Sequence, residues 1–248
     1  MKREYLPLQY NNFMKRIFAV VMIIWIVPIV YCLTREDNIA FNWNFVIFPL
    51  ILSVIIPLIL YISRKVFLGS LVAFELDFHT VYDLEKRNKK KELYNLNLLV
   101  NLHFFDGNFQ EAINCTDRIL RLSSKQNDIY TARHQKILSL FLSGKTENII
   151  ELISQQRLIK QDVSPYYVFI EKYLGANYEA AVKSIKKILE EKNIEAQNHR
   201  KILIYYLMKM CFLKIGDSKQ VENCTNQILM ADRSRRTFFS NMCDNSDT

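Results

Sequence analysis

Glycine and proline are scarce in this chain of 248 residues, with five of each. All-β sandwiches and barrels need many tight turns, and these residues usually form them, so the composition argues against an all-β class. Apolar residues recur instead at three- and four-residue steps through most of the chain, which is typical of helices. We therefore predict an all-α protein.

Motifs that carry catalysis or bind a metal are also missing. The sequence contains no phosphate-binding glycine loop, nucleophile elbow, H-E-x-x-H pattern or spaced pair of carboxylates. Its five cysteines form no C-x-x-C pair, and its four histidines lie near no matching ligands. An odd number of cysteines without a disulfide framework suits a reducing compartment. We expect no enzymatic activity, no cofactor and no metal.

The net charge of +8 is not spread evenly. Residues 86–91 and 233–236 together hold eight basic residues, and without them the part after residue 65 is about neutral to slightly acidic. Nucleic-acid binders usually distribute basic residues along one face and place aromatic residues between them. We therefore do not expect nucleic acid as a partner.

Two long apolar runs, at 17–33 and 45–62, contain no charged residue. As helices they would each span about 25–27 Å, close to the roughly 30 Å of a bilayer core. The first run lacks the small-residue cleavage site of a signal peptide, and the second run follows at once. We predict a transmembrane hairpin of two helices.

The basic residues around these runs predict the orientation of the hairpin. The flank at 1–16 has four Lys or Arg residues and two more directly follow the second run, whereas the loop at 34–44 has one against two acidic residues. Because cytoplasmic flanks are enriched in Lys and Arg, both termini should be cytoplasmic and the loop external. Neither run holds an Asp, Glu, His, Lys or Arg, so the hairpin reads as an anchor in the cell membrane rather than a transporter.

Residues 63–91 should connect this anchor to the rest of the chain. One face of 66–84 is apolar, since Phe67, Leu71, Phe74, Phe78 and Val81 recur at helical spacing. This helix could lie along the membrane or begin the soluble bundle. The linker after it carries Lys86, Arg87, Lys89, Lys90 and Lys91. It is either a solvated loop or a lipid-facing patch, since anionic lipid attracts each such charge by about 1 kcal/mol.

Beyond residue 92 the sequence repeats. Gly107, Gly144, Gly175 and Gly216 are 37, 31 and 41 residues apart, and each separates two apolar-periodic stretches. Such glycines suit the left-handed residue that ends a helix. Candidate caps for the following helices are Asn108, Thr146, Asn177 and Asp217. A helical hairpin of about thirty residues cannot bury its own apolar face, so neighbours must stack. We predict a helical repeat domain at 92–232 and a flexible tail at 233–248.

Two stretches, GNFQEAINCTDRIL from residue 107 and GANYEAAVKSIKKIL from residue 175, resemble the turn and second helix of tetratricopeptide repeats. Phe109 with Ala112, and Tyr178 with Ala181, match the aromatic and small residues of that pattern. The second and fourth units depart from it. The resemblance covers about 93–232 and implies a short α-solenoid whose first helices line a concave surface that binds a peptide or protein.

The resemblance also implies which side chains line this groove. They are Tyr94, Asn101, Phe104, His134, Phe141, Tyr166, Tyr173, Tyr206 and Met210. For each aromatic residue, packing between helices is the competing interpretation. Asn101 lies where some repeats of this type hold a peptide backbone, but the uncharged Asn97 one turn earlier argues against capture of a terminal carboxylate.

These features favour a membrane-anchored scaffold or adaptor that binds a protein or peptide partner. An accessory subunit of a larger membrane complex for transport or sensing, with the spans as the interface, is the main alternative. A third hypothesis is a sensor of a small peptide or lipid, in which 66–91 transmits the signal.

Overall fold

The computed structural model describes residues 77–85, 92–159, 164–190 and 197–244, with a few isolated positions between 55 and 71. The described segments form helices and contain no strand, so the predicted all-α class is confirmed. The chain divides into two compact units, Met1–Gly69 and Ser70–Thr248. The second unit contains nearly all of the described residues, and the fold below is that of this unit.

Most residues of the predicted membrane segments lie outside the residues that the structure describes. The flank at 1–16, the run at 17–33 and the loop at 34–44 lie outside the described residues, as does most of 45–62. Among the helices that the structure does describe, none is long and apolar enough to cross a bilayer. The transmembrane hairpin therefore stays a prediction, and so does the role of the basic linker at 86–91, which also lies outside the described residues.

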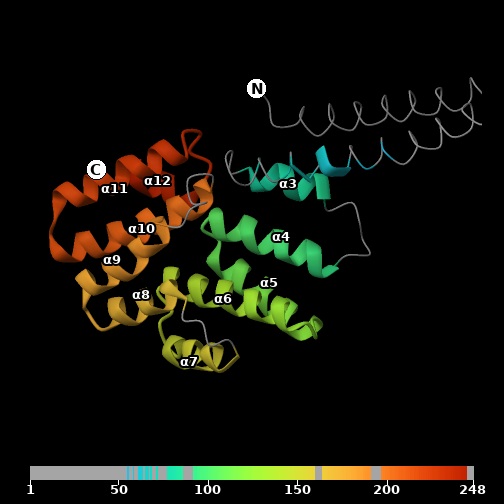
Figure 1. The fold of residues 1–248 in the computed structure, drawn as a ribbon, viewed down its shortest axis with the longest axis horizontal. Helices are drawn as coiled ribbons and strands as arrows, with labels where there is room; N and C mark the ends of the chain where they lie inside the picture. The colour runs from blue at the N-terminus through green and yellow to red at the C-terminus, as the bar shows by residue number, and fades with distance from the viewer. Residues whose placement is uncertain are drawn as a thin grey trace, which may run out of the picture. The chain divides into compact units, whose positions relative to one another are not determined.

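The described part of the second unit is a series of helices (Figure 1). They are α3 (Phe78–Glu85), α4 (Glu92–Phe105), α5 (Phe109–Leu122), α6 (Gln126–Leu142), α7 (Ile149–Ile159), α8 (Pro165–Leu174), α9 (Tyr178–Lys186), the 3-10 helix η2 (Lys187–Glu190), α10 (Asn198–Ile215), α11 (Ser218–Ala231) and α12 (Phe238–Asp244). From α3 to α7, and again from α8 to α12, each α-helix packs against the next one along the chain.

The turns between paired helices share one hydrogen-bonding pattern. At the end of α4 the amide of Asn108 donates to the carbonyl of His103, and Gly107 between them takes a left-handed φ of 79°. Gly144 and Gly216 take the same conformation after α6 and α10, as predicted. At the end of α8 the left-handed residue is Ala176 instead of Gly175, because that helix continues one residue further before the same turn.

Two of the predicted caps form as side-chain hydrogen bonds. Asn177 accepts from the amide of Ala180 at 3.2 Å, and Asp217 accepts from the amide of Gln220 at 3.1 Å. Each bond satisfies an amide that the first turn of a helix leaves without a partner. Asn108 lies at the predicted N-cap position of α5, but its side chain makes no such hydrogen bond.

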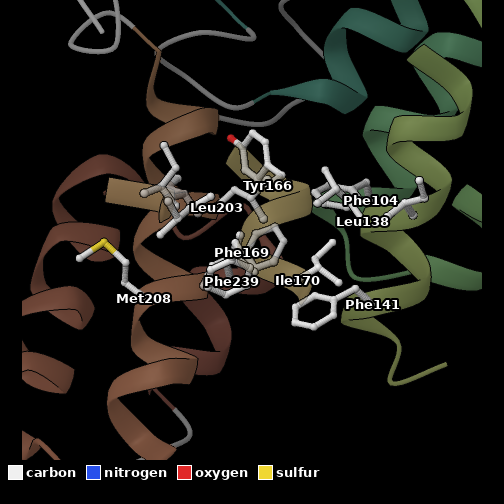
Figure 2. Close-up of a cluster of buried hydrophobic side chains, with 14 of the residues drawn as sticks. Phe104, Leu138, Phe141, Tyr166, Phe169, Ile170, Leu203, Met208 and Phe239 are labelled. Carbon is white, nitrogen blue, oxygen red and sulfur yellow. The ribbon is translucent and has the colours of Figure 1, made fainter. Parts of the chain in front are cut away.

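One hydrophobic cluster runs through the whole repeat region. It takes buried side chains from every helix between α3 and α12, and Figure 2 shows part of it where α6, α8 and α10 meet. A smaller cluster between α4, α5 and α6 contains Leu96, Val100, Cys115, Ile119 and Ala132. Each fully buried large apolar side chain contributes about 1.5–3 kcal/mol, so stacking of the hairpins stabilises helices that are individually short.

The segment at 233–248 differs from its prediction as a flexible tail. Up to residue 244 it is folded, and it ends in the short helix α12. Phe239 and Cys243 are one helical turn apart on the same face and are 0% and 2% exposed. The prediction was wrong for this part because the apolar face of α12 finds its cover in helices that come much earlier in the chain.

Candidate partner-binding groove

The nine residues predicted to line a groove all lie on α4, α6, α8 and α10, the first helices of the hairpins. Their exposure differs widely. Phe104, Phe141 and Tyr166 are buried in the main hydrophobic cluster, where they present no surface to a partner. Asn101, His134, Tyr173, Tyr206 and Met210 are partly buried, and Tyr94 is exposed. Most of these nine side chains therefore pack between helices.

Several of these side chains meet through their rings. His134 lies edge to face with Tyr166, with ring centres 5.5 Å apart, and Phe141 lies edge to face with Tyr173 at 5.3 Å. Asn101 is engaged with its own helix, because its side-chain amide donates to the carbonyl of Asn97 at 3.1 Å. The role proposed by the resemblance for Asn101, holding a peptide backbone, would require this bond to break.

The helix α12 packs against both the first and the last hairpin. The ring of Phe239 lies 5.8 Å from those of Phe104 and Phe105 on α4 and 5.0 Å from that of Tyr206 on α10. Phe104 and Tyr206, which were both predicted to line the groove, thus contact one side chain from the segment predicted to be a flexible tail. The pair Phe238-Phe239 followed by Cys243 one turn later was the signal for an apolar helix face.

Phe238 sits on the turn between α4 and α5. Its ring lies edge to face with that of Phe109, with centres 5.4 Å apart. Gly107 makes this contact possible, since a Cβ atom there would lie 2.6 Å from Cγ of Phe238 and 2.9 Å from its Cβ. Gly107 therefore has two reasons to be glycine, its left-handed backbone and the approach of α12.

A buried carboxylate organises the start of α12. Asp232, which is 2% exposed, accepts hydrogen bonds from the amide and hydroxyl of Thr237, both at 2.8 Å, and from the hydroxyl of Ser240 at 2.7 Å. Its second oxygen accepts from the amide of Arg236 at 3.1 Å. A buried carboxylate must be satisfied in this way, and a negative charge at the first turn of a helix is favourable.

Polar contacts also join α12 to the elements around it. Arg236, just before the helix, makes an ion pair with Asp77 at the start of α3, with 3.3 Å between nitrogen and oxygen. At the other end, Nζ of the buried Lys209 on α10 donates to Sγ of Cys243 at 3.5 Å. The position of α12 is thus specified at both ends as well as by its aromatic pair.

His134 belongs to a polar cluster between α6, α7 and α8. Its Nδ1 atom lies 3.0 Å from the hydroxyl of Tyr167, and the side-chain amide of Gln156 donates to the carbonyl of Tyr130 at 2.9 Å. Burial lowers the pKa of His134 to about 4 and raises that of Tyr167. Both side chains are neutral near pH 7, so this cluster is suited to holding three helices together rather than to transferring protons.

The described cysteines are buried thiols. Burial is the main cause that raises the pKa of Cys211 to about 12 and that of Cys224 to about 11, so both stay protonated and poorly nucleophilic. Among the described residues, no group of three or more His, Cys, Asp or Glu side chains is arranged to hold a metal ion.

Comparison with known proteins gives no match to a family model, a curated protein or a solved structure.

Proposed function

We propose that this protein is a membrane-anchored adaptor whose tetratricopeptide-like helical hairpins bind a segment of a partner protein at the cytoplasmic face of the membrane. One observation carries the proposal. The short helix α12, which follows the repeats in the sequence, packs against the first helices α4 and α10 through Phe239. This face of the stacked hairpins therefore accepts a helical segment from outside the repeats.

Packing within the hairpins supports the tetratricopeptide-like part of the proposal. Ala112 on α5 and Ala181 on α9, the two small residues that carry the resemblance, are both 0% exposed. Each lies on a second helix that packs closely against its first helix, as α5 does with α4 and α9 with α8. A larger side chain at either position would force the paired helices apart.

The predicted hairpin anchor explains why such a domain would be tied to the membrane. With both termini cytoplasmic, the repeat domain would be held near the inner leaflet, where its partner is concentrated by tethering. A membrane-impermeant thiol reagent applied to intact cells tests this topology. A cysteine at Asn38 should react and one at Asn127, which is exposed on α6, should not. Reaction at Asn127 alone would contradict the orientation.

Capture of partners from native membranes tests the adaptor role. The tagged full chain is compared with a variant in which residues 17–62 are replaced by an unrelated transmembrane hairpin. An adaptor keeps its crosslinked partners after this exchange, because binding resides in the repeat domain. Loss of all partners would contradict the proposal and would favour an accessory subunit whose spans form the interface.

A further inference from the structure

We propose that α12 is a displaceable internal ligand, and that the partner presents the same chemistry, a short helix that begins with two adjacent aromatic residues preceded by a basic residue. This inference rests on the function proposed above and specifies which segment of a partner the repeat domain binds. It follows from the surface that α12 covers and from the way in which α12 is held there. We call this surface, formed by Phe104, Phe105, Gly107, Phe109 and Tyr206, the seat.

The seat is built for two aromatic side chains. Phe239 is 0% exposed and packs between α4 and α10, while Phe238 packs on Phe109 at the α4–α5 turn. Gly107 gives Phe238 a close approach that any other residue would obstruct. Phe104 and Phe105, which Phe239 covers, are 1% and 5% exposed, and uncovering them without replacement is unfavourable. An occupant that displaces α12 must therefore bring aromatic rings of its own.

The rim of the seat adds a charge. Asp77 is only 7% exposed and pairs with Arg236, which lies two residues before the aromatic pair. Asp77 also accepts hydrogen bonds from the amide and hydroxyl of Thr80, at 3.0 and 2.8 Å, so without Arg236 it loses its ion pair but stays hydrogen-bonded. An incoming segment that restores this ion pair should carry Arg or Lys at that spacing. The expected recognition element is thus a basic residue, one further residue and then two aromatic residues at the start of a helix.

The attachment of α12 suits exchange. The helix has only seven residues, and the residues before it at 233–235 are exposed, with Arg235 at a left-handed φ of 50°. The bonds from Thr237 and Ser240 reach Asp232, the C-cap residue of α11, so they keep the start of α12 close to that helix. To leave, α12 must give up the ring contacts of Phe239 with α4 and α10 and the bond between Lys209 and Cys243, so a competing segment has to replace these contacts. An internal ligand of this kind lowers the apparent affinity of a partner, because the partner binds only the fraction of molecules in which the seat is empty.

The test measures binding of a labelled peptide with the sequence of residues 232–248 to the full chain in lipid nanodiscs. The emptied variant F238A/F239A leaves every side chain of the seat intact. It should bind this peptide at least about tenfold more tightly than the wild-type chain does, because its own α12 competes less well. A peptide in which both phenylalanines are alanine should bind neither chain. Equal affinity of the wild-type peptide for the two chains would overturn the proposal.

Glycine substitutions locate the binding. In the emptied variant, G107A should abolish the gain in affinity for the peptide, since the Cβ of the new alanine would meet the peptide's first aromatic ring. G216A is the matched control, because Gly216 has a similar φ of 83° and open space around its Cβ position. Equal effects of the two substitutions would overturn the proposal. Should F238A/F239A fail to fold by circular dichroism, F238A alone keeps the test, because Phe238 is only partly buried and a smaller gain in the same direction is expected.

Two outcomes separate this inference from the proposed function. If wild-type and emptied chains capture the same partners from membranes and the peptide does not compete, the inference fails while the adaptor role stands. If the peptide binds as expected but the chain with exchanged spans captures no partner, the adaptor role fails while the seat stands. A wild-type chain that forms a dimer by exchanging α12 would make a second copy the occupant and would overturn the assignment to a partner.

Discussion

The substitution G107A offers the sharpest test of the seat of α12. Alanine at this φ of 79° costs about 1–2 kcal/mol of backbone strain. Its Cβ would also lie 2.6 Å from Cγ of Phe238, so that ring must leave its contact with Phe109. Losing about half of the burial energy of a phenylalanine adds roughly 1 kcal/mol. We expect G107A to destabilise the full chain by about 2–3 kcal/mol in urea unfolding monitored by circular dichroism.

The control for this measurement is G144A. Gly144 has a similar φ of 75° and nothing within 4 Å of the added Cβ, so only the strain of about 1–2 kcal/mol applies. A double-mutant cycle then isolates the contact. With F238A in the background, G107A should cost no more than G144A, because the obstructing ring is gone. Equal destabilisation by the two glycine substitutions in the wild-type chain, or strict additivity of G107A and F238A, would refute the reasoning.

Two further predictions concern the same core. F239A should destabilise the chain by about 3–5 kcal/mol, as expected for a fully buried phenylalanine, whereas M242A on the exposed side of α12 should change the free energy of unfolding by less than about 0.5 kcal/mol. Similar losses of unfolding free energy in F239A and M242A would show that α12 does not pack on the core. Burial lowers the pKa of His134 and of His199 to about 4, below the unfolded value near 6.5, so the unfolded state binds more protons between these values. Stability is therefore full above pH 6.5 and falls as the pH drops towards 4, by about 2 kcal/mol per histidine at pH 5. The variant H134Q/H199Q should lose this part of the slope, and an unchanged pH dependence would show that these histidines are not the cause.

Local sequence signals predicted the hairpins well. The glycines at 107, 144 and 216 end helices in the left-handed conformation because this geometry depends on neighbouring residues alone. Ala176 was missed since the sequence offers Gly175 one residue earlier, and the choice depends on where the preceding helix stops. Such a shift by one residue changes little in the packing.

The occupant of the groove could not be predicted in the same way. The resemblance implied that Phe104 and Tyr206 line a groove, whereas in the structure Phe104 is buried in the main hydrophobic cluster and Tyr206 packs against it. Which segment covers them depends on tertiary contacts, and for Phe104 that segment lies more than a hundred residues away. Phe239 supplies that cover, and nothing in the local pattern of 233–248, with its three arginines, records which surface it meets.

Photo-crosslinking from position 238 tests the central claim most directly. A photoreactive phenylalanine analogue replaces Phe238 in the full chain, which is then irradiated in membranes and mapped by mass spectrometry. The partly buried ring packs on the α4–α5 turn and near Tyr206 on α10, so crosslinks within the chain should fall between residues 104 and 109, with some at Tyr206, in the absence of partner. An excess of partner should move them to the partner. Crosslinks in the unliganded chain that are absent from 104–109 would contradict the account.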